Sequence, residues 1–330
     1  MSKIQRDSQA DKPEEKAKYK IKNWSAYNKA LVNRGNISLY IDEQVLESWY
    51  DDSPAQRGGQ YIYSDLCIES MMMLKTLYKL GYRQTEGFVT SLFELIGWPE
   101  VWVPSYTQLN RRAHELQIAA YEVPTSSGPL HITVDSTGLK VYGEGEWKVR
   151  KHGWSKHRTW RKLHIGVDPE THFIHAHTLT DNSADDAGQV EDLLDQVEQD
   201  IDEFSGDGAY DKRKCWDRLE EQKIIGIIPP QVNANYWVDK KGKLLKHGRN
   251  KILKQIDKRG RAEWKKRSGY HRRSLAETAM MRFKTIHGPT LYSRNPQTQQ
   301  TETDIKIKLL NIMTAQGMPV SKKVKKKKGA

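Results

Sequence analysis

The stretch "HITVDSTGLKVY", residues 131–142, decides the fold class of this chain. Ile132 and Val134 alternate in it with polar neighbours, and this period of two is typical of a strand with one buried face. Two further strand patterns follow, "KLHIGVD" at 162–168 and "HFIHAHTL" at 172–179. The turn sequence "DPET" joins these two patterns, so the segment after residue 130 is predicted to be strand-rich.

Elements beyond the third strand alternate between helix and strand. The segment 181–203 has ten acids and no Lys or Arg, and its apolar residues recur at helical spacing, as on a helix with one solvated face. A short strand leads into "FSGDGAYD" at 204–211, and "IIGIIPP" at 224–230 is a second, buried strand. Three strands, helix, strand, helix, strand and a later helix predict a mixed α/β sheet covered by helices.

The region from 42 to 116 has the apolar spacing of several short helices. Ser105 is a natural N-cap for a helix whose apolar side, formed by Leu109, Ala113 and Leu116, faces inward. Three donors are then expected to face outward, Gln108, Arg111 and Arg112. This format suits the recognition helix of a helix-turn-helix domain, although plain packing of short helices is an open alternative.

The formal net charge of +12 over 330 residues indicates an anionic partner. Between 231 and 268 lies a basic segment in which Lys and Arg are interleaved with Tyr236, Trp237 and Trp264. Such a combination can follow a phosphate backbone and stack on bases, and a solvated basic insertion is the alternative. No apolar run is long enough to span a bilayer, and two isolated cysteines suit a reducing compartment, so we expect a soluble cytoplasmic protein without membrane contact.

Three carboxylates stand where chemistry is expected. Asp135 lies toward the end of the first strand, and Asp207 sits between two glycines at the end of another, where ligands tend to bind in open sheets. Glu277 is the single acid in the basic helical stretch "GYHRRSLAETAMMRFK", residues 269–284. The three are 72 and 70 residues apart, so only the fold could bring them together.

Three carboxylates within about 4 Å would repel by roughly 4 kcal/mol per pair at an effective dielectric near 20, and hard divalent cations would relieve that repulsion. Two such ions about 3.5–4 Å apart suit phosphoryl transfer. Structural alternatives remain open. Ser274 and Glu277 also match a capping box, Asp168 suits a turn, and His175 and His177 share a strand face without an evident third ligand.

The stretch around Glu277 resembles the signature of the bacterial insertion-sequence DDE transposases, in the branch named after insertion sequence five. Tyr270, Arg273, Glu277 and Lys284 match its Tyr, two residues, Arg, three residues, Glu, six residues, Lys pattern without a gap. "TVDSTGLKVYGEGEWKVRKHG" resembles the block around the first acid of that family, and "GDGAYD" the block around the second. The likeness runs from "NWSAYNKALVNRG" to "LNIMTAQGMP", nearly the whole chain.

The resemblance implies an RNase H-like fold in which Asp135, Asp207 and Glu277 bind two Mg²⁺ or Mn²⁺ ions. Such enzymes cut the terminal inverted repeats of their element and join the freed 3′-hydroxyls to target DNA. It also implies two protomers, or a higher oligomer, on double-stranded DNA in the bacterial nucleoid. The DNA contacts would come from Tyr270, Arg273, Lys284 and the neighbouring Arg272, with the N-terminal helices recognising the ends.

The predicted organisation has four parts: a disordered N-terminus at 1–20, a helical DNA-end-binding domain at 21–125, an RNase H-like catalytic domain at 126–318 and a basic disordered tail at 319–330. The basic insertion at about 231–268 belongs to the catalytic domain. Two other functions remain in view. A transposase-derived regulator would bind ends without cutting, and an RNase H-like nuclease would cut RNA–DNA hybrids.

Overall fold

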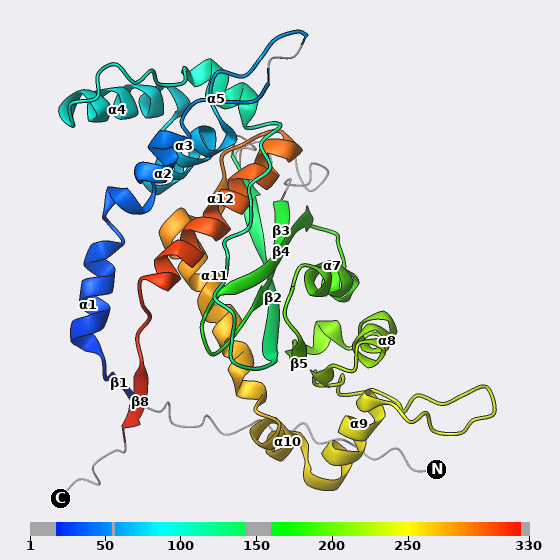
Figure 1. Ribbon diagram of the computed structural model, residues 1–330. Coiled ribbons are helices and arrows are strands. Elements are labelled where there is room, and N and C mark those ends of the chain that lie inside the picture. Colours follow the sequence, from blue (N-terminus) through cyan, green and yellow to red (C-terminus); the bar gives the residue numbers. More distant parts are fainter. Residues whose placement is uncertain (1–17, 55–56, 143–159, 325–330) are drawn as a thin grey trace, which may run out of the picture.

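The computed structural model describes residues 18–54, 57–142 and 160–324, and its centre is a six-stranded sheet (Figure 1). Five strands lie in the order β4-β3-β2-β5-β6, and the short β7 pairs with the end of β2. Their bounds are β2 Leu130–Val141, β3 Trp160–Val167, β4 Ile174–Asp181, β5 Ile201–Ser205, β6 Ile225–Ile227 and β7 Thr290–Leu291.

The first three strands of the sheet are antiparallel to one another, whereas β5 and β6 run parallel to β2 and to each other. The parallel pairs require crossover connections, and the helical segments between β4, β5 and β6 supply them. Each predicted strand is present, and the sheet is mixed and flanked by helices. The predicted fold class, a mixed α/β sheet flanked by helices, is therefore confirmed.

Helices cover both faces of the sheet (Figure 1). One face packs against η2 (Ala187–Gln189), α7 (Val190–Asp195) and α8 (Arg213–Glu221), with α9 (Gly248–Arg259) and α10 (Arg261–Arg267) beside them. The other face packs against α11 (Ser274–His287) and α12 (Pro296–Ala315). Ile132 and Val134 of β2 point into the first layer and Leu139 into the second, as the alternation along the strand requires.

The N-terminal region between residues 43 and 112 forms a separate helical layer above one end of α12, whereas the helix at 24–33 lies beside the other end (Figure 1). The α-helices of these two parts are α1 Trp24–Asn33, α2 Glu43–Glu47, α3 Asp65–Leu77, α4 Tyr82–Leu95 and α5 Tyr106–Arg112, with the 3₁₀ turn η1 at Ile37–Leu39. Ser105 caps α5 as predicted, accepting a hydrogen bond from the Gln108 amide at 3.3 Å. The predicted inward residues Leu109, Ala113 and Leu116 are buried.

Helix α12 belongs to two hydrophobic cores at once. Ile305 and Leu309 pack with the N-terminal helices, whereas Ile307 and Leu310 pack with α11 and the sheet. A buried ion pair joins Lys306 to Glu302 at 2.7 Å, and Glu302 also accepts the amides of the segment after β7. The helical and sheet regions therefore share one structural element, which the predicted boundary at 125–126 does not anticipate.

The predicted disorder at 1–20 and 319–330 is wrong for part of each segment. β1 (Lys18–Ile21) pairs antiparallel with β8 (Ser321–Val324) in a separate two-stranded sheet. These lysine-rich strands are held by backbone hydrogen bonds, which charge composition does not reveal. Residues 1–17 and 325–330 lie outside the described residues.

The sequence "GEGEWKVRKHG", part of the block that resembles the family pattern around the first acid, also lies outside the described residues. Among those that are described, no helix is both long and apolar enough to cross a membrane.

Because Ile305 of α12 is fully buried against the N-terminal helices, we expect Ile305→Ala to lower the free energy of unfolding by about 2–5 kcal/mol. Helical and sheet regions should still unfold in one transition, measured by urea denaturation with circular dichroism and tryptophan fluorescence. Met281→Ala, at a side chain 62% exposed on α11, is the control and should change stability by less than about 0.5 kcal/mol. Two separate transitions would contradict the shared role of α12.

Candidate active site

Asp135 projects from β2 toward the layer that contains α11. It lies four residues before Leu139, which packs against α11, and alternate residues of a strand share one face. Its Oδ1 accepts a hydrogen bond from the Ser136 amide at 2.9 Å, and its side chain is 20% exposed. The first acid is therefore half-buried between the sheet and a helix.

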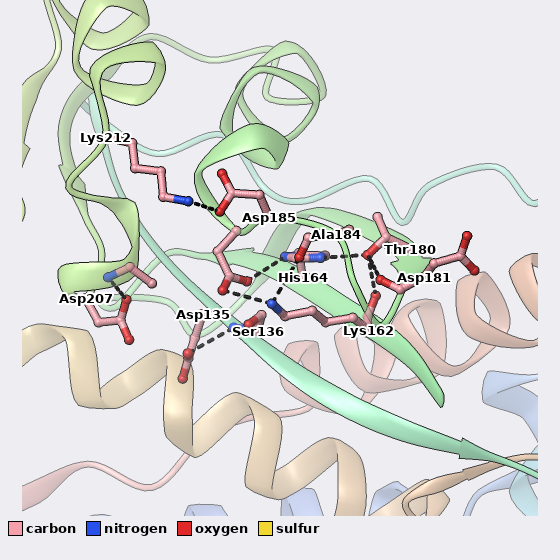
Figure 2. Close-up of polar contacts among 12 residues, drawn as sticks. Asp135, Ser136, Lys162, His164, Thr180, Asp181, Ala184, Asp185, Asp207 and Lys212 are labelled. Atoms are coloured by element: carbon pink, nitrogen blue, oxygen red, sulfur yellow. Dashed lines mark hydrogen bonds and ion pairs between the residues drawn. The ribbon is translucent and has the colours of Figure 1, made fainter. Parts of the chain in front are cut away.

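Asp207 lies two residues beyond the last paired residue of β5. In the parallel ladder Thr133 of β2 pairs with Ser205 of β5, so each acid follows a paired residue by two positions. Neighbouring strands are about 4.8 Å apart, which brings the two carboxylates to the same edge. Asp207 caps the 3₁₀ turn η3 (Gly208–Tyr210), accepting from the Ala209 amide at 2.8 Å, and Figure 2 shows both acids facing the same space.

Glu277 reaches this space from the first turn of α11. The preceding residues Tyr270–Arg273 form a 3₁₀ turn, η4, and the α-helix begins at Ser274. The alternative capping box does not form, because the Ser274 hydroxyl donates to the His271 carbonyl and Glu277 pairs with Arg273. Glu277 is 52% exposed, the most accessible of the three acids.

Arg273 is the cation between the acids. Its Nη2 forms an ion pair with Glu277, and its Nη1 lies 3.9 Å from Asp135 Oδ2. Burial alone would lower the pKa of Arg273, but Tyr270, Glu277 and Asp135 together raise it. Burial is the largest cause that raises the pKa of Asp135, and the charges of Asp207 and Glu277 add to it, so the three carboxylates interact electrostatically.

A fourth carboxylate, Asp186, contacts Ser136, the residue after Asp135, and two side chains of β3, Lys162 and His164, which Figure 2 labels. Its Oδ2 is 2.9 Å from Lys162 Nζ and its Oδ1 is 3.3 Å from His164 Nδ1. Burial alone would raise its pKa, but hydrogen bonds from His164, Ser136 and Lys162 lower the pKa well below the usual range. Asp186 is therefore a charged anchor that fixes β2 and β3 next to the first acid.

A chain of polar contacts ties η4 to the strands beneath it. Arg272 donates to Glu203 at 2.5 Å, and His131 lies 3.3 Å from the same carboxylate. The other ring nitrogen of His131 is 2.7 Å from the Ser205 hydroxyl. Burial, and next the charge of Arg272, lower the pKa of His131 to about 4, so the ring is neutral at pH 7. This chain holds the start of α11 across the ends of β2 and β5.

Gly206 leaves room for the ring of Tyr210 directly under the acids. A Cβ at Gly206 would lie 2.8 Å from the Tyr210 ring, so the close approach requires glycine. The Tyr210 side chain is 1% exposed, and burial raises its pKa well above the usual value, with Asp186, Asp135 and Asp207 adding to the effect. The glycine before Asp207 thus serves packing beneath the site.

The carboxylates do not form a closed three-ligand metal site. In the described part of the chain, no group of three His, Cys, Asp or Glu side chains is arranged to hold a metal ion. Glu277 is engaged by Arg273, whereas Asp135 and Asp207 face a common space. One or two carboxylates plus substrate phosphates are the usual protein ligands of Mg²⁺, so the donor set of Asp135 and Asp207 fits such an ion.

Two of the predicted outward residues of α5 have structural partners. Arg112 is buried rather than exposed, since it pairs with Asp65, donates to the Tyr63 carbonyl at 2.8 Å and stacks on Tyr61. That prediction is wrong because its partners come from a distant segment. Gln108 is half-buried, and its Oε1 accepts the Ser105 amide at 3.0 Å. Arg111 is exposed, as predicted.

The aromatic residues of the basic segment 231–268 do not form an open stacking surface. Trp264 is 3% exposed and packs into the core with Ile256, so the prediction that it stacks on bases is wrong. Trp237 is covered by the guanidinium groups of Arg213 and Arg249, each 4.5 Å from a ring centroid. The apolar residues of α9 and α10 recur at helical spacing, which is the sequence pattern of a buried helix face.

The remaining candidates have structural roles. Asp168 accepts the amides of Glu170 and Thr171, as predicted for a turn residue. His177 pairs with Asp304 at 2.7 Å, and no metal-binding group includes it or His175 within the described residues.

Several residues of the site were not singled out from the sequence: His131, His164, Asp186, Glu203 and Tyr210. The only sequence signal was position. His131 precedes Asp135 by four residues, and Glu203 precedes Asp207 by four, so each lies on the same strand face as the acid. Polar residues at such positions can hold a nearby carboxylate in place.

Comparison with protein-family models identifies the class of the chain. A model described as "Transposase DDE domain" matches residues 126–312, more than half of the chain, and a second with the same description matches residues 32–144. The chain therefore belongs to the DDE transposase family. Members of this family cleave and transfer DNA strands and generally use divalent metal ions.

Three solved structures share a low general similarity with the chain. They are a piggyBac transposase synaptic complex with hairpin DNA (10% identity, 91% of this chain and 77% of that one, TM-score 0.38), a Drosophila P element transposase strand transfer complex (13%, 82% and 70%, TM-score 0.32) and a Mos1 transposase paired-end complex (14%, 76% and 86%, TM-score 0.20). Family membership rests on the family models alone.

The raised pKa of Asp135 predicts a stability effect. The ionised form is less favourable in the folded than in the unfolded chain, so its charge opposes folding at neutral pH, and the penalty is absent below the ordinary pKa of 3.8. We expect Asp135→Asn to raise the free energy of unfolding at pH 7 by on the order of 1 kcal/mol.

The gain should shrink as the pH falls through the raised pKa and vanish below about pH 3.8, as measured by urea denaturation across pH. Asp52→Asn, at an exposed acid, is the control and should give no such pH-dependent gain. A gain that persists unchanged at pH 3 would show that burial of this charge is not its cause.

Proposed function

We propose that the protein is a DNA transposase of the branch named after insertion sequence five, acting on double-stranded DNA in the bacterial cytoplasm. Its substrates would be the terminal inverted repeats of its element, whose freed 3′-hydroxyls it would join to target DNA. The observation that carries the proposal is the placement of Asp135 and Asp207 on the adjacent strands β2 and β5, facing one space, with Arg273 contacting both Asp135 and Glu277 beside them. The Tyr270, Arg273, Glu277, Lys284 spacing supports the branch.

Asp135 and Asp207 are the residues that would hold a divalent cation, Mg²⁺ or Mn²⁺, with Glu277 as the third carboxylate when two ions are bound. Such ions, when bound, supply Lewis-acid stabilisation of the attacking and leaving oxygens in phosphoryl transfer. The half-buried position of Asp135 favours cation binding, because a bound positive charge offsets the burial, and next the repulsion from Asp207 and Glu277, that raise its pKa.

Arg273 has two roles in this proposal. Without DNA its guanidinium neutralises part of the charge of Glu277 and Asp135. A DNA phosphate beside the acids would compete for the same donors, since Arg binds phosphate through paired N–H groups. Release of Glu277 from Arg273 would then leave the carboxylate free to bind a cation. Tyr270, whose ring lies 5.8 Å from the Arg273 guanidinium, orients it.

The proposed partners are the two inverted-repeat ends and the target duplex, brought together by two protomers or a higher oligomer. Lys284 lies two helical turns beyond Glu277 on α11 and would contact a phosphate. Arg111 is exposed on α5 and is proposed to contact the ends. Arg272 is held by Glu203, so its contribution to DNA binding would be to place η4.

One observation favours a second function. Because Glu277 is paired with Arg273 and no three-carboxylate metal group exists in the described residues, a regulator that binds ends without cutting them is the alternative. Metal-dependent cleavage separates the two functions.

Purified protein with Mg²⁺ should nick a labelled inverted-repeat end. Asp135→Asn, Asp207→Asn and Glu277→Gln should each lower the nicking rate by at least about 10³-fold, because each removes a charge that stabilises phosphoryl transfer, while DNA affinity measured by gel shift stays unchanged. Asp181→Asn is the matched control, since this acid pairs with Arg161 at the end of β4, and it should nick normally. Full nicking by one of the three would remove that residue from the site, and binding without nicking by the unsubstituted protein would favour the regulator.

If Lys284 contacts a phosphate, its removal should release one fewer counterion on binding. The slope of log affinity against log salt should then become shallower by about 0.9 in Lys284→Ala, as measured by fluorescence anisotropy from low to high salt. An unchanged slope would mean that Lys284 has no phosphate partner.

A further inference from the structure

A cavity of about 530 Å³ lies between the N-terminal helices and the C-terminal end of the sheet, away from the acids. The ends of α3 and α4 form one wall, and the segment from β7 into α12 forms the other. Among its lining residues are Lys75, Lys79, Tyr82, Tyr292 and Arg294. The cavity is therefore built by both regions of the chain, at the place where α12 joins them.

A second cavity, of about 620 Å³, continues the first between α4 and α5. The two share Gly81, Tyr82 and Asn110 in their linings, so they adjoin, and together they are here called the junction groove. Arg83 and Arg111 line its second half. The groove thus passes from the edge of the sheet across the helical layer.

The junction groove is strongly basic. Five cations line it, Lys75, Lys79, Arg83, Arg111 and Arg294, in addition to Lys306. Its single acidic lining residue in the described chain is Glu302, which is already matched by Lys306 and by two backbone amides. Burial is the largest cause that lowers the pKa of Lys75, because it makes the charged ammonium group less stable. An anion beside this group would stabilise its charged form and offset the effect of burial.

Among the cations that line the first cavity, Lys79 and Arg294 are the exposed ones, whereas Lys75 is half-buried and Lys306 is buried. Both side chains are exposed residues that line the cavity, and neither has an ion-pair partner among the residues that the structure describes. Aromatic rings stand beside the cations: Tyr142 and Tyr292 form a ring pair at 5.6 Å on the rim, and Arg83 lies 4.6 Å from the Tyr106 ring centroid. Exposed cations interleaved with aromatic rings are typical of nucleic-acid contacts.

The groove lies in line with the acids along two elements. Asp135 on β2 and Tyr142, the residue after the end of β2, are seven residues apart. At 3.3 Å per residue this separation is about 23 Å. Glu277 and His287 are ten residues apart on α11, which is about 15 Å at 1.5 Å per residue. A DNA strand rises about 3.4 Å per nucleotide, so the groove is roughly four to seven nucleotides from the acids.

We propose that the junction groove binds backbone phosphates of the DNA end, four to seven nucleotides from the cleaved bond, through Lys79 and Arg294. The proposal rests on the proposed function, because it takes the acids as the point of cleavage. Phosphate is the shared chemistry of DNA and of a free nucleotide, and the charge and length of the groove favour DNA. Contacts on both sides of α12 would then hold the helical region and the catalytic sheet on one duplex.

The test uses the full chain in EDTA, so that binding is measured without cleavage. We expect the Lys79→Ala/Arg294→Ala double variant to bind an inverted-repeat duplex roughly a hundredfold more weakly by fluorescence anisotropy, since each charged hydrogen bond contributes about tenfold or more. The slope of log affinity against log salt should be shallower by about 1.8. Lys29→Ala, at an exposed lysine of α1 outside the groove, is the matched control and should bind like the unsubstituted protein.

Position is tested with duplexes that carry a neutral methylphosphonate at single sites. Substitution four to seven nucleotides from the cleaved bond should weaken binding of the unsubstituted protein and have little further effect on the double variant. Thermal unfolding checks that the double variant is folded, as expected for two exposed side chains. If the methylphosphonate weakens DNA binding equally in the unsubstituted protein and the double variant, the proposed position of the groove is wrong.

The remaining outcomes distinguish the two proposals. If the unsubstituted protein does not bind the duplex, the transposase proposal and the groove fail together. If it binds and the double variant binds equally well, only the groove fails. Binding of ATP that is lost in the double variant, with DNA affinity unchanged, would reassign the groove to a free nucleotide and overturn its assignment to DNA.

Discussion

Repulsion among like charges that are partly removed from water is the constraint on which this structure depends. Asp135, Asp207 and Glu277 come from a strand, a strand end and a helix, and burial together with the two other charges raises the pKa of Asp135, so its ionised form would be more stable in solvent. The fold keeps them together by placing cations and hydrogen-bond donors around them. Arg273 lies between two of the acids, and Lys162 with His164 holds a fourth carboxylate, Asp186, next to Ser136 of the same strand as the first. Much of the polar interior near the strand ends is explained by this need.

The support for the acids comes from both layers of the sheet. On one side Asp186 fixes β2 against β3, and on the other the contacts from Arg272 through Glu203 to His131 and Ser205 hold η4 over the strands. Neither set touches a substrate in the proposed mechanism. These contacts hold the acids in fixed positions, because a cation or a phosphate is bound tightly only when its ligands are held close to their final positions.

Much of the fold could be predicted from the sequence, since the alternation at 131–142 and the buried strands leave a strong local pattern. The three acids were singled out from their expected places at strand ends and from the resemblance around Glu277; Asp207 does follow the end of β5, whereas Asp135 lies within β2, paired with Ile165, so its expected place at a strand end was wrong. What local patterns do not contain is the identity of distant partners. The local sequence predicts that Arg112 faces outward, because its partner Asp65 is 47 residues away in the chain. The pairing of β1 with β8 is likewise invisible, because its ladder consists of backbone groups.

Helix α12 also determines when a newly made chain can become functional. Both hydrophobic cores need it, since Ile305 completes the one and Leu310 the other. During synthesis the ribosome releases the N-terminal helices and most of the sheet long before this segment emerges. Until then the nascent chain has exposed apolar surface that nothing covers, and products of interrupted translation would be substrates for chaperones and proteases rather than partly folded proteins.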